Sequence, residues 1–201
     1  MKKRRIFRNL NDKEFAWVLY DVGNSAYTML ACALIPIWFK AMAIGTKPGQ
    51  LTSDRATAYY SMAIAVITIV VALLGPMCGA ISDYKGMKKI FFTSTVAVGV
   101  CGCILNGFAC QWIVFLLLFA VTKIFYNMSL MFYDSMLNDI TTEERMDEVS
   151  SYGYAWGYLG SCIPFLIALV AYVLGPDMAG IISGKLSMAI GFAVTGLWWL
   201  L

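Results

Sequence analysis

The chain has 201 residues, of which 60% are hydrophobic and only 13% are charged, and its net charge is +3 at pH 7. A soluble domain carries about 25% charged residues, so this composition excludes an ordinary soluble protein and indicates an integral membrane protein. The small positive charge reflects where basic residues lie relative to a bilayer, and we expect no nucleic-acid partner.

Six apolar segments follow one another along the chain, and they predict an all-α membrane protein. A bilayer offers no water to unpaired backbone groups, so segments of about 20 apolar residues that cross it form helices. The expected helices are 15–43, 57–81, 90–108, 111–137, 150–174 and 185–201. We expect a basic N-terminus, residues 1–14, followed by a six-helix transmembrane bundle, residues 15–201.

The basic residues predict the orientation of this bundle. Ten Lys and Arg residues lie in the N-terminus and in the turns after the second and fourth segments, against four on the other side. Short cytoplasmic loops carry the excess of basic residues, so we expect a cytoplasmic N-terminus. Short loops favour a bacterial plasma membrane, with a vacuolar membrane as the eukaryotic alternative.

Polar residues of the first segment share one helical face. At 100° per residue, Asp21, Asn24, Ser25 and Thr28 lie within a narrow arc, beside Tyr27 in the same stretch. A charged group inside a bilayer usually faces a cavity or a partner. We interpret this face as a candidate substrate or coupling site, with an aspartate that snorkels to the headgroups as the alternative.

The fourth segment carries a second polar face, formed by Lys123, Asn127 and Asp134. Lys123 lies about twelve residues inside the segment, too deep to reach the headgroups easily. Two readings remain open for it: a substrate or coupling role, or a structural ion pair with a carboxylate of a neighbouring helix.

Small residues recur on the second and fifth segments at a spacing that predicts close helix packing in a bilayer. They are Gly75 and Gly79 in the second segment, and Gly153, Gly157 and Gly160 in the fifth. Trp156 lies among the latter, and it is a candidate for contact with a substrate together with Tyr152 and Tyr158. A place in the aromatic belt is the alternative.

Histidine is absent, and none of the six cysteines forms a C-x-x-C pair. The commonest general base and metal ligand is therefore missing, and so is the spacing of a metal site. We expect no metal, no cofactor and no enzymatic activity, and we interpret the cysteines as small buried residues.

A charged turn separates the second and third segments, in the stretch GPMCGAISDYKGMKK. It resembles the signature that the major facilitator superfamily carries after its second helix. The matching positions are Gly79, Ile81, Ser82, Asp83, Gly86, Lys88 and Lys89, whereas Tyr84 and Met87 stand where basic residues are usual. Asp83 either caps the next helix or, as the resemblance implies, bridges to a second half of the transporter.

Three further stretches are similar to the vacuole-effluxer-like branch of that superfamily, whose members export amino acids. They are WVLYDVGNSAY at 17–27, FYDSMLNDI at 132–140 and SSYGYAWGYLG at 150–160. The terminal GLWWLL resembles an interrupted sixth helix of that branch. The resemblance implies an N-terminal half whose partner is a second six-helix half, absent from this chain.

The resemblance also implies a layout and a mechanism. The first and fourth helices line a central cavity, the second and fifth pack across the two halves, and the third and sixth are peripheral. The implied activity is secondary transport of a small solute such as an amino acid by alternating access, with Asp21 suited to proton coupling or to an amino group. A membrane scaffold or assembly subunit without transport is the alternative function.

Overall fold

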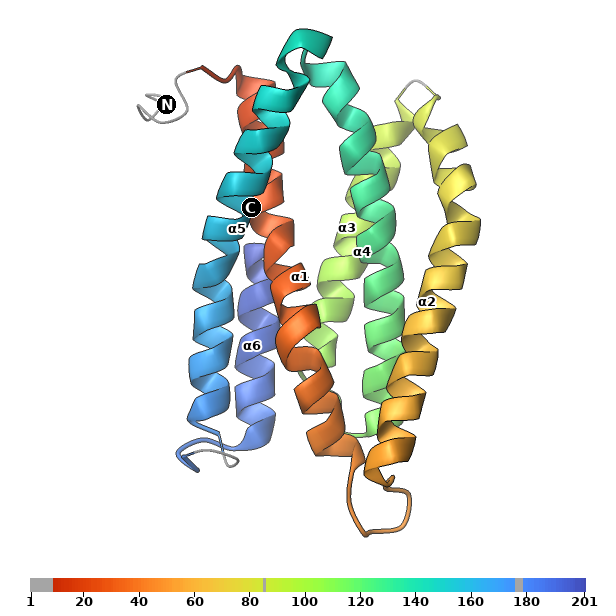
Figure 1. Cartoon of the computed structure of the whole chain (residues 1–201), viewed down its shortest axis with the longest axis vertical. Helices are drawn as coiled ribbons and strands as arrows, with labels where there is room; N and C mark the ends of the chain where they lie inside the picture. The colour runs from red at the N-terminus through yellow and green to blue at the C-terminus, as the bar shows by residue number, and fades with distance from the viewer. Residues whose placement is uncertain (1–8, 85, 176–178) are drawn as a thin grey trace.

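The computed structural model describes residues 9–84, 86–175 and 179–201, and these residues form a bundle of helices (Figure 1). The helices are α1 (Asp12–Ala43), α2 (Ser53–Ser82), α3 (Met87–Asn106), α4 (Trp112–Ile140), α5 (Glu143–Val173) and α6 (Gly184–Trp198). No strand occurs among the described residues, so the all-α prediction is confirmed.

The helices agree with the apolar segments at most of their ends, and the largest difference lies at the start of α5. This helix begins at Glu143, seven residues before the expected residue 150. Its first turn holds Glu143 and Glu144, and acidic side chains stabilise a helix N-terminus because its backbone dipole is positive there. Apolar content alone misses a polar turn of this kind.

Five of the described helices, α1 to α5, are long and apolar enough to cross a membrane. The last helix, α6, has 15 residues, fewer than the roughly 17–25 residues that a span requires. The chain is therefore a multi-pass membrane protein, whereas a sixth span remains a prediction.

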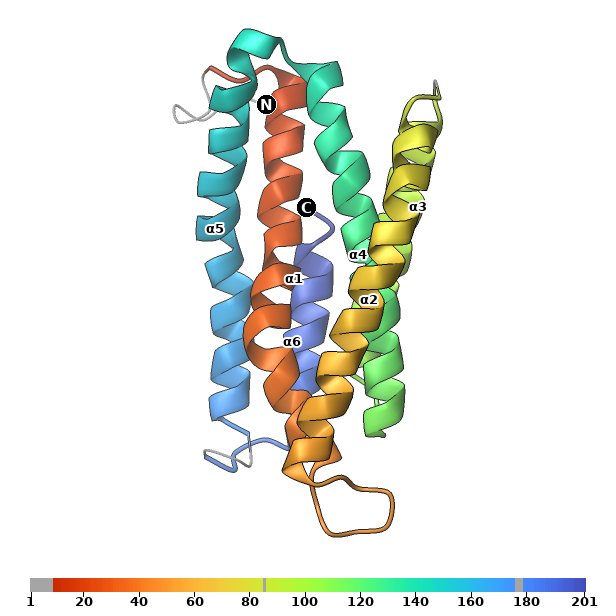
Figure 2. The same cartoon turned by 45° about the vertical axis from the view of Figure 1, so that its right-hand side comes forward.

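The bundle divides into two groups of helices (Figures 1 and 2). One group is formed by α1, α5 and α6, and the other by α2, α3 and α4. Contacts of α1 with α4, and of α3 with α6, join the groups. The contacts are symmetric when α1, α2 and α3 are exchanged with α4, α5 and α6: α1 packs on α5 as α4 packs on α2, and α6 packs on α5 as α3 packs on α2. Such symmetry is typical of a bundle of two inverted repeats.

The centre of the bundle is built mainly from aromatic side chains of α1 and α4. Tyr27 and Phe39 of α1, and Phe115 and Phe119 of α4, are almost completely buried, as is Phe192 of α6. Half of the most apolar window of α1 is buried, against 11% of that of α2. Helix α1 is therefore the central helix of this chain, and α2 is a peripheral one.

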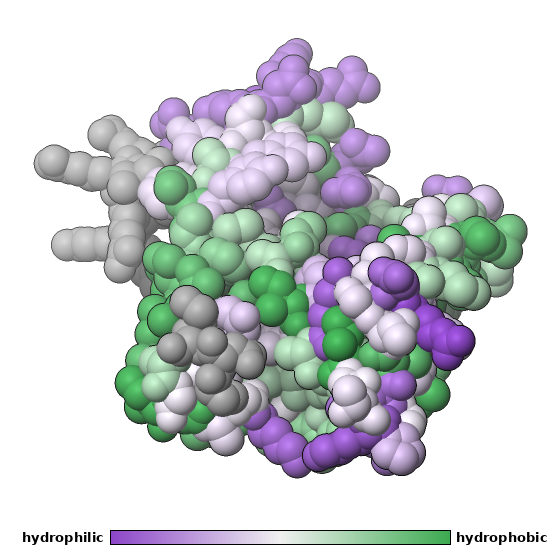
Figure 3. Space-filling model, turned by 60° about the horizontal axis from the view of Figure 1, so that its bottom comes forward, coloured by the Kyte–Doolittle hydropathy of each residue, from purple (hydrophilic) through white to green (hydrophobic). Residues whose placement is uncertain are grey.

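Charged residues gather at the two ends of the bundle. The start of α1, the turn between α2 and α3, and the turn between α4 and α5 lie together at one end, at the top of Figure 1. Figure 3 looks towards the opposite end, where hydrophilic residues form patches and hydrophobic residues cover much of the rim. Among the described residues, this arrangement puts Lys13, Lys88, Lys89 and Arg145 at the same end.

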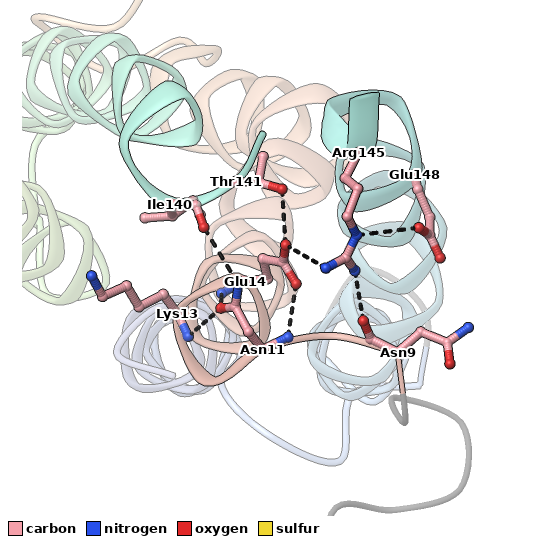
Figure 4. Close-up of polar contacts among 8 residues, drawn as sticks. All are labelled: Asn9, Asn11, Lys13, Glu14, Ile140, Thr141, Arg145 and Glu148. Carbon is pink, nitrogen blue, oxygen red and sulfur yellow. Dashed lines mark hydrogen bonds and ion pairs between the residues drawn. The ribbon is translucent and has the colours of Figure 1, made fainter. Parts of the chain in front are cut away.

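A buried carboxylate holds the first of these ends together (Figure 4). Glu14 is only 1% exposed and accepts hydrogen bonds from the backbone of Asn11 at 2.7 Å and from the hydroxyl of Thr141 at 2.8 Å. Its other partner is the guanidinium of Arg145, at 3.2 Å. Asn11 also caps α1 through its own side chain, so one cluster fixes the start of α1 to the turn between α4 and α5.

The replacement Arg145→Gln should destabilise the protein, because it leaves the buried charge of Glu14 without its cation. Breaking a buried ion pair costs about 3–5 kcal/mol, and we expect about 1–3 kcal/mol here because the Arg145 side chain is 36% exposed. Thermal unfolding in detergent measures the effect, with the exposed Arg55→Gln as the matched control.

The double variant Glu14→Gln/Arg145→Gln should be more stable than Arg145→Gln alone, because it contains no uncompensated buried charge. Equal melting temperatures for Arg145→Gln and Arg55→Gln would contradict the role assigned to the cluster.

Candidate functional site

A groove with a volume of about 430 Å³ lies between α1, α4 and α5. Helix α1 contributes Trp17, Asp21, Asn24, Ser25, Thr28 and Met29, α4 contributes Tyr126, Leu130, Tyr133, Asp134 and Leu137, and α5 contributes Ser150, Tyr154, Tyr158 and Ser161. Its lining is rich in hydroxyl, amide and carboxylate groups although the helices around it are apolar. Such a groove is the natural candidate for a solute site in this bundle.

Five residues proposed from the sequence meet in this groove. Asp21, Asn24, Ser25 and Thr28 lie on one face of α1, at the helical spacing that groups them, and Asp134 of α4 faces them. The two polar faces of the sequence therefore line a common space. Tyr20 and Tyr133, which precede the two aspartates, are also neighbours, with ring centroids 5.0 Å apart.

Hydrogen bonds connect α1 to α4 along the floor of the groove. The hydroxyls of Thr28 and Tyr126 are bonded to each other, and the Tyr126 hydroxyl donates to Oδ1 of Asn24 at 3.4 Å. The amide of Asn24 in turn donates to the Asp21 carboxylate at 3.3 Å. Asn24 and Tyr126 are buried. These hydrogen bonds therefore connect the Thr28 hydroxyl, near the middle of α1, through Tyr126 and Asn24 to the Asp21 carboxylate.

Glycines of α5 bring the Asp21 face of α1 into close contact with α5. A β-carbon added at Gly157 would lie 2.8 Å from the hydroxyl of Ser25 and 3.0 Å from a carboxylate oxygen of Asp21. One added at Gly153 would lie 2.8 Å from the Trp17 ring. Real β-carbons do not tolerate contacts this short, so the two helices approach this closely only with glycine at both positions.

Aromatic residues form much of the remaining wall. Of these, Tyr158 was a candidate from the sequence, whereas Trp17, Tyr126, Tyr133 and Tyr154 were not. Trp17 stacks on Tyr133 with ring centroids 4.3 Å apart and donates a hydrogen bond from its indole to the Tyr133 carbonyl at 3.1 Å. Tyr154 and Tyr158 of α5 are 66% and 69% exposed and face the groove. Their spacing of four residues puts them on one helical face, a signal that the sequence did contain.

Lys123 lies beside the groove and not in its lining. Its ammonium is 4.8 Å from the ring centroid of Tyr126 and 5.7 Å from that of Tyr27. Within residues 9–84, 86–175 and 179–201, Lys123 forms no ion pair. The structural ion pair expected as one alternative is therefore absent from the described residues, and aromatic faces stabilise the charge instead.

Three other residues proposed for the site lie elsewhere. Tyr27 is completely buried against Trp199, with ring centroids 5.3 Å apart. Trp156 packs against the apolar cluster around Trp17 and Val149, and Asn127 does not line the groove. These three side chains point away from the groove. Successive residues of a helix differ in direction by 100°, so a residue beside a lining residue can face the packed interior instead.

The charged turn after α2 is held by contacts to α4. Lys88 forms an ion pair with Asp139 at 2.6 Å and donates to the carbonyl of Ser135 at 3.1 Å. Gly86 precedes α3 with φ of +83°, a conformation that favours glycine. Among the described residues, no side chain caps α3, so the capping role considered for Asp83 is wrong. Asp83 and Lys89 are exposed.

The glycines of α2 differ from those of α5. A β-carbon at Gly75 would lie 3.5 Å from Met131, an ordinary contact, and one at Gly79 would meet nothing within 4 Å. The close packing expected for this pair is therefore absent from the described part of the chain. Gly160 resembles the other α5 glycines, because its β-carbon would overlap Val22.

The cysteines are less buried than the sequence suggested. Cys78 and Cys103 are buried, whereas four others are exposed, namely Cys32, Cys101, Cys110 and Cys162. A cysteine can lie on the apolar outer face of a membrane helix as readily as in a protein core. Hydropathy alone does not tell which of these two places a cysteine occupies. The described residues contain no group of three His, Cys, Asp or Glu side chains that could hold a metal ion.

Comparison with known proteins reveals one strong similarity. The chain is 34% identical over 197 residues to the uncharacterized MFS-type transporter YxiO of Bacillus subtilis, and the aligned region is 96% of this chain and 45% of that relative. The chain thus spans less than half the length of the relative that it matches. No family model and no solved structure matches the chain.

This similarity to an MFS-type transporter agrees with the resemblance of the charged turn after α2 to the major facilitator signature. It extends over nearly the whole chain, so it includes the helices that line the groove.

The replacement Gly153→Ala should destabilise the bundle. Its β-carbon would press on Trp17, which cannot move freely because it is stacked on Tyr133 and hydrogen-bonded to it. Overpacking of this kind costs about 1–3 kcal/mol, and thermal unfolding in detergent measures it.

Gly79→Ala is the matched control for Gly153→Ala. It should be neutral or stabilising by up to about 1 kcal/mol, because open space surrounds Gly79 and alanine favours helix. A lower melting temperature for Gly79→Ala than for Gly153→Ala would contradict the packing described here.

Proposed function

We propose that the chain is the N-terminal six-helix half of a major facilitator secondary transporter, which moves a small solute across a membrane by alternating access. The observation that carries the proposal is the polar groove between α1, α4 and α5. Polar groups cost free energy inside a bilayer unless they face a cavity or one another. A groove that gathers them therefore indicates a path for a solute.

The partner of this half is a second six-helix bundle. Both α2 and α5 present wide apolar faces to the outside, with Leu73 71% and Leu159 63% exposed. In transporters built from repeated halves, the solute site lies between the halves near the middle of the bilayer. A second half packed on the exposed faces of α2 and α5 would complete the site with residues of its own.

Amino acids are the solutes that we propose first. Their ammonium group would lie at Asp21, whose carboxylate is oriented by the amide of Asn24. Their carboxylate would lie towards Lys123, whose ammonium has no ion pair among the described residues. Asp21 would also be able to exchange a proton with the cavity and so couple transport to a proton gradient.

The turn after α2 would act as part of the gate on the cytoplasmic side. Lys88 is bound to α4, which connects the turn to a helix of the groove. Asp83 is exposed and has no role in capping, so it remains available to contact the second half in one state of the transport cycle.

Lys123→Met should lower amino-acid uptake by the reconstituted full-length protein about tenfold, which corresponds to ~1.4 kcal/mol of lost stabilisation. Lys47→Met is the matched control, because Lys47 lies in the exposed loop between α1 and α2. Uptake of radiolabelled amino acids into proteoliposomes measures the effect, and equal rates for the two variants would remove Lys123 from the mechanism.

Asp83→Asn should lower uptake while leaving the melting temperature and membrane insertion unchanged, because the exposed Asp83 forms no contact that supports the fold of the described residues. Uptake, thermal unfolding and the amount of protein extracted from membranes give the three readouts. Loss of insertion, or unchanged uptake, would reduce the turn to a signal for topology.

A further inference from the structure

The groove combines two kinds of group that attract a positive charge. Its charged lining residues are Asp21 and Asp134, and the lining contains no Lys or Arg. Neither carboxylate forms an ion pair among residues 9–84, 86–175 and 179–201. The described groove therefore has a formal charge of −2 that no side chain in its lining compensates.

Aromatic rings surround these carboxylates. Trp17, Tyr126, Tyr133, Tyr154 and Tyr158 all line the groove. The faces of such rings carry negative electrostatic potential and attract organic cations, most strongly where water is excluded. The exposed Tyr154 and Tyr158 lie one turn apart on α5, each next in sequence to a glycine that packs on the Asp21 face of α1. Carboxylates and rings therefore line the same groove from different helices.

The protein already uses this chemistry for a cation of its own. The Lys123 ammonium lies over Tyr126 at 4.8 Å from its ring centroid, outside the lining of the groove. Helix α4 therefore holds an ammonium group on an aromatic face, at membrane depth and without a carboxylate partner in the described residues. A solute amine in the groove would find similar rings and two carboxylates in addition.

We propose that this groove recognises the positively charged end of its solute, a protonated amine or a quaternary ammonium group, between Asp21, Asp134 and the aromatic wall. The inference rests on the proposed transport function, since it takes the groove as the solute site. It goes further because it makes the cationic group the required feature: organic amines without a carboxylate are ligands, and neutral solutes of the same shape are not.

A pair of probes with the same shape and different charge tests the inference. Choline and 3,3-dimethylbutan-1-ol differ in having nitrogen or carbon at the branched centre, so only choline is charged. Equilibrium binding to the full-length protein in nanodiscs should give a dissociation constant for choline at least about tenfold lower than for the alcohol, in line with cation–π and charge attraction of ~1.4 kcal/mol or more.

Variants then assign the attraction to the groove. Asp21→Asn and Asp134→Asn should each weaken choline binding about tenfold and leave binding of the alcohol unchanged. Tyr158→Leu should weaken choline binding, whereas Tyr158→Phe should retain it because the ring remains. Asp54→Asn is the matched control, since Asp54 is exposed in the first turn of α2 and does not line the groove.

Equal affinity for the two probes, no binding of either, or choline binding that is unchanged in both aspartate variants would overturn the inference. Circular dichroism and thermal unfolding of each variant show that a loss of binding is not a loss of fold. Transport is measured separately: choline binding without any transport by the full-length protein would reject the proposed function and leave the recognition of cations standing. Transport of neutral solutes without choline binding would do the reverse.

Discussion

The close approach of α1 to α5 is the contact on which the rest of the groove depends. Gly153 and Gly157 leave room for Trp17, Asp21 and Ser25 where any β-carbon would collide with them. Within a bilayer, hydrophobic attraction between helices is weak and close packing of small residues replaces it. The same glycines that stabilise the helix pair therefore fix the height and direction of the Asp21 carboxylate.

A second close approach fixes the other side of α1. The β-carbon that Gly23 lacks would lie 3.1 Å from the carbonyl oxygen of Trp198, and the Trp198 indole donates to the carbonyl of Val22 at 3.2 Å. Trp199 also donates to the Tyr20 hydroxyl at 3.2 Å. Helix α1 is thus held on opposite faces by α5 and by the end of α6, and the groove lies on the α5 side, where Trp17, Asp21 and Ser25 both contact the glycines and line the groove.

Much of this arrangement is predictable from the sequence, and the part that is not has a physical explanation. Hydropathy locates the helices because a helix that crosses a bilayer needs a long apolar stretch. The rotation of 100° per residue predicts that Asp21 and Asn24 share a face because both belong to one helix. Contacts between distant segments carry no such signal. The burial of Glu14 by Arg145 joins residues 131 positions apart, and nothing near Glu14 in the sequence distinguishes it from an exposed first-turn acid.

Tyr126 explains how the two charged faces of the sequence are related. Asp21 and Lys123 lie on different helices, and Tyr126 connects them. Its ring face lies under the Lys123 ammonium and its hydroxyl bonds to Asn24, which bonds to Asp21. One side chain thus stabilises a cation and orients an anion while keeping them apart, so neither charge neutralises the other.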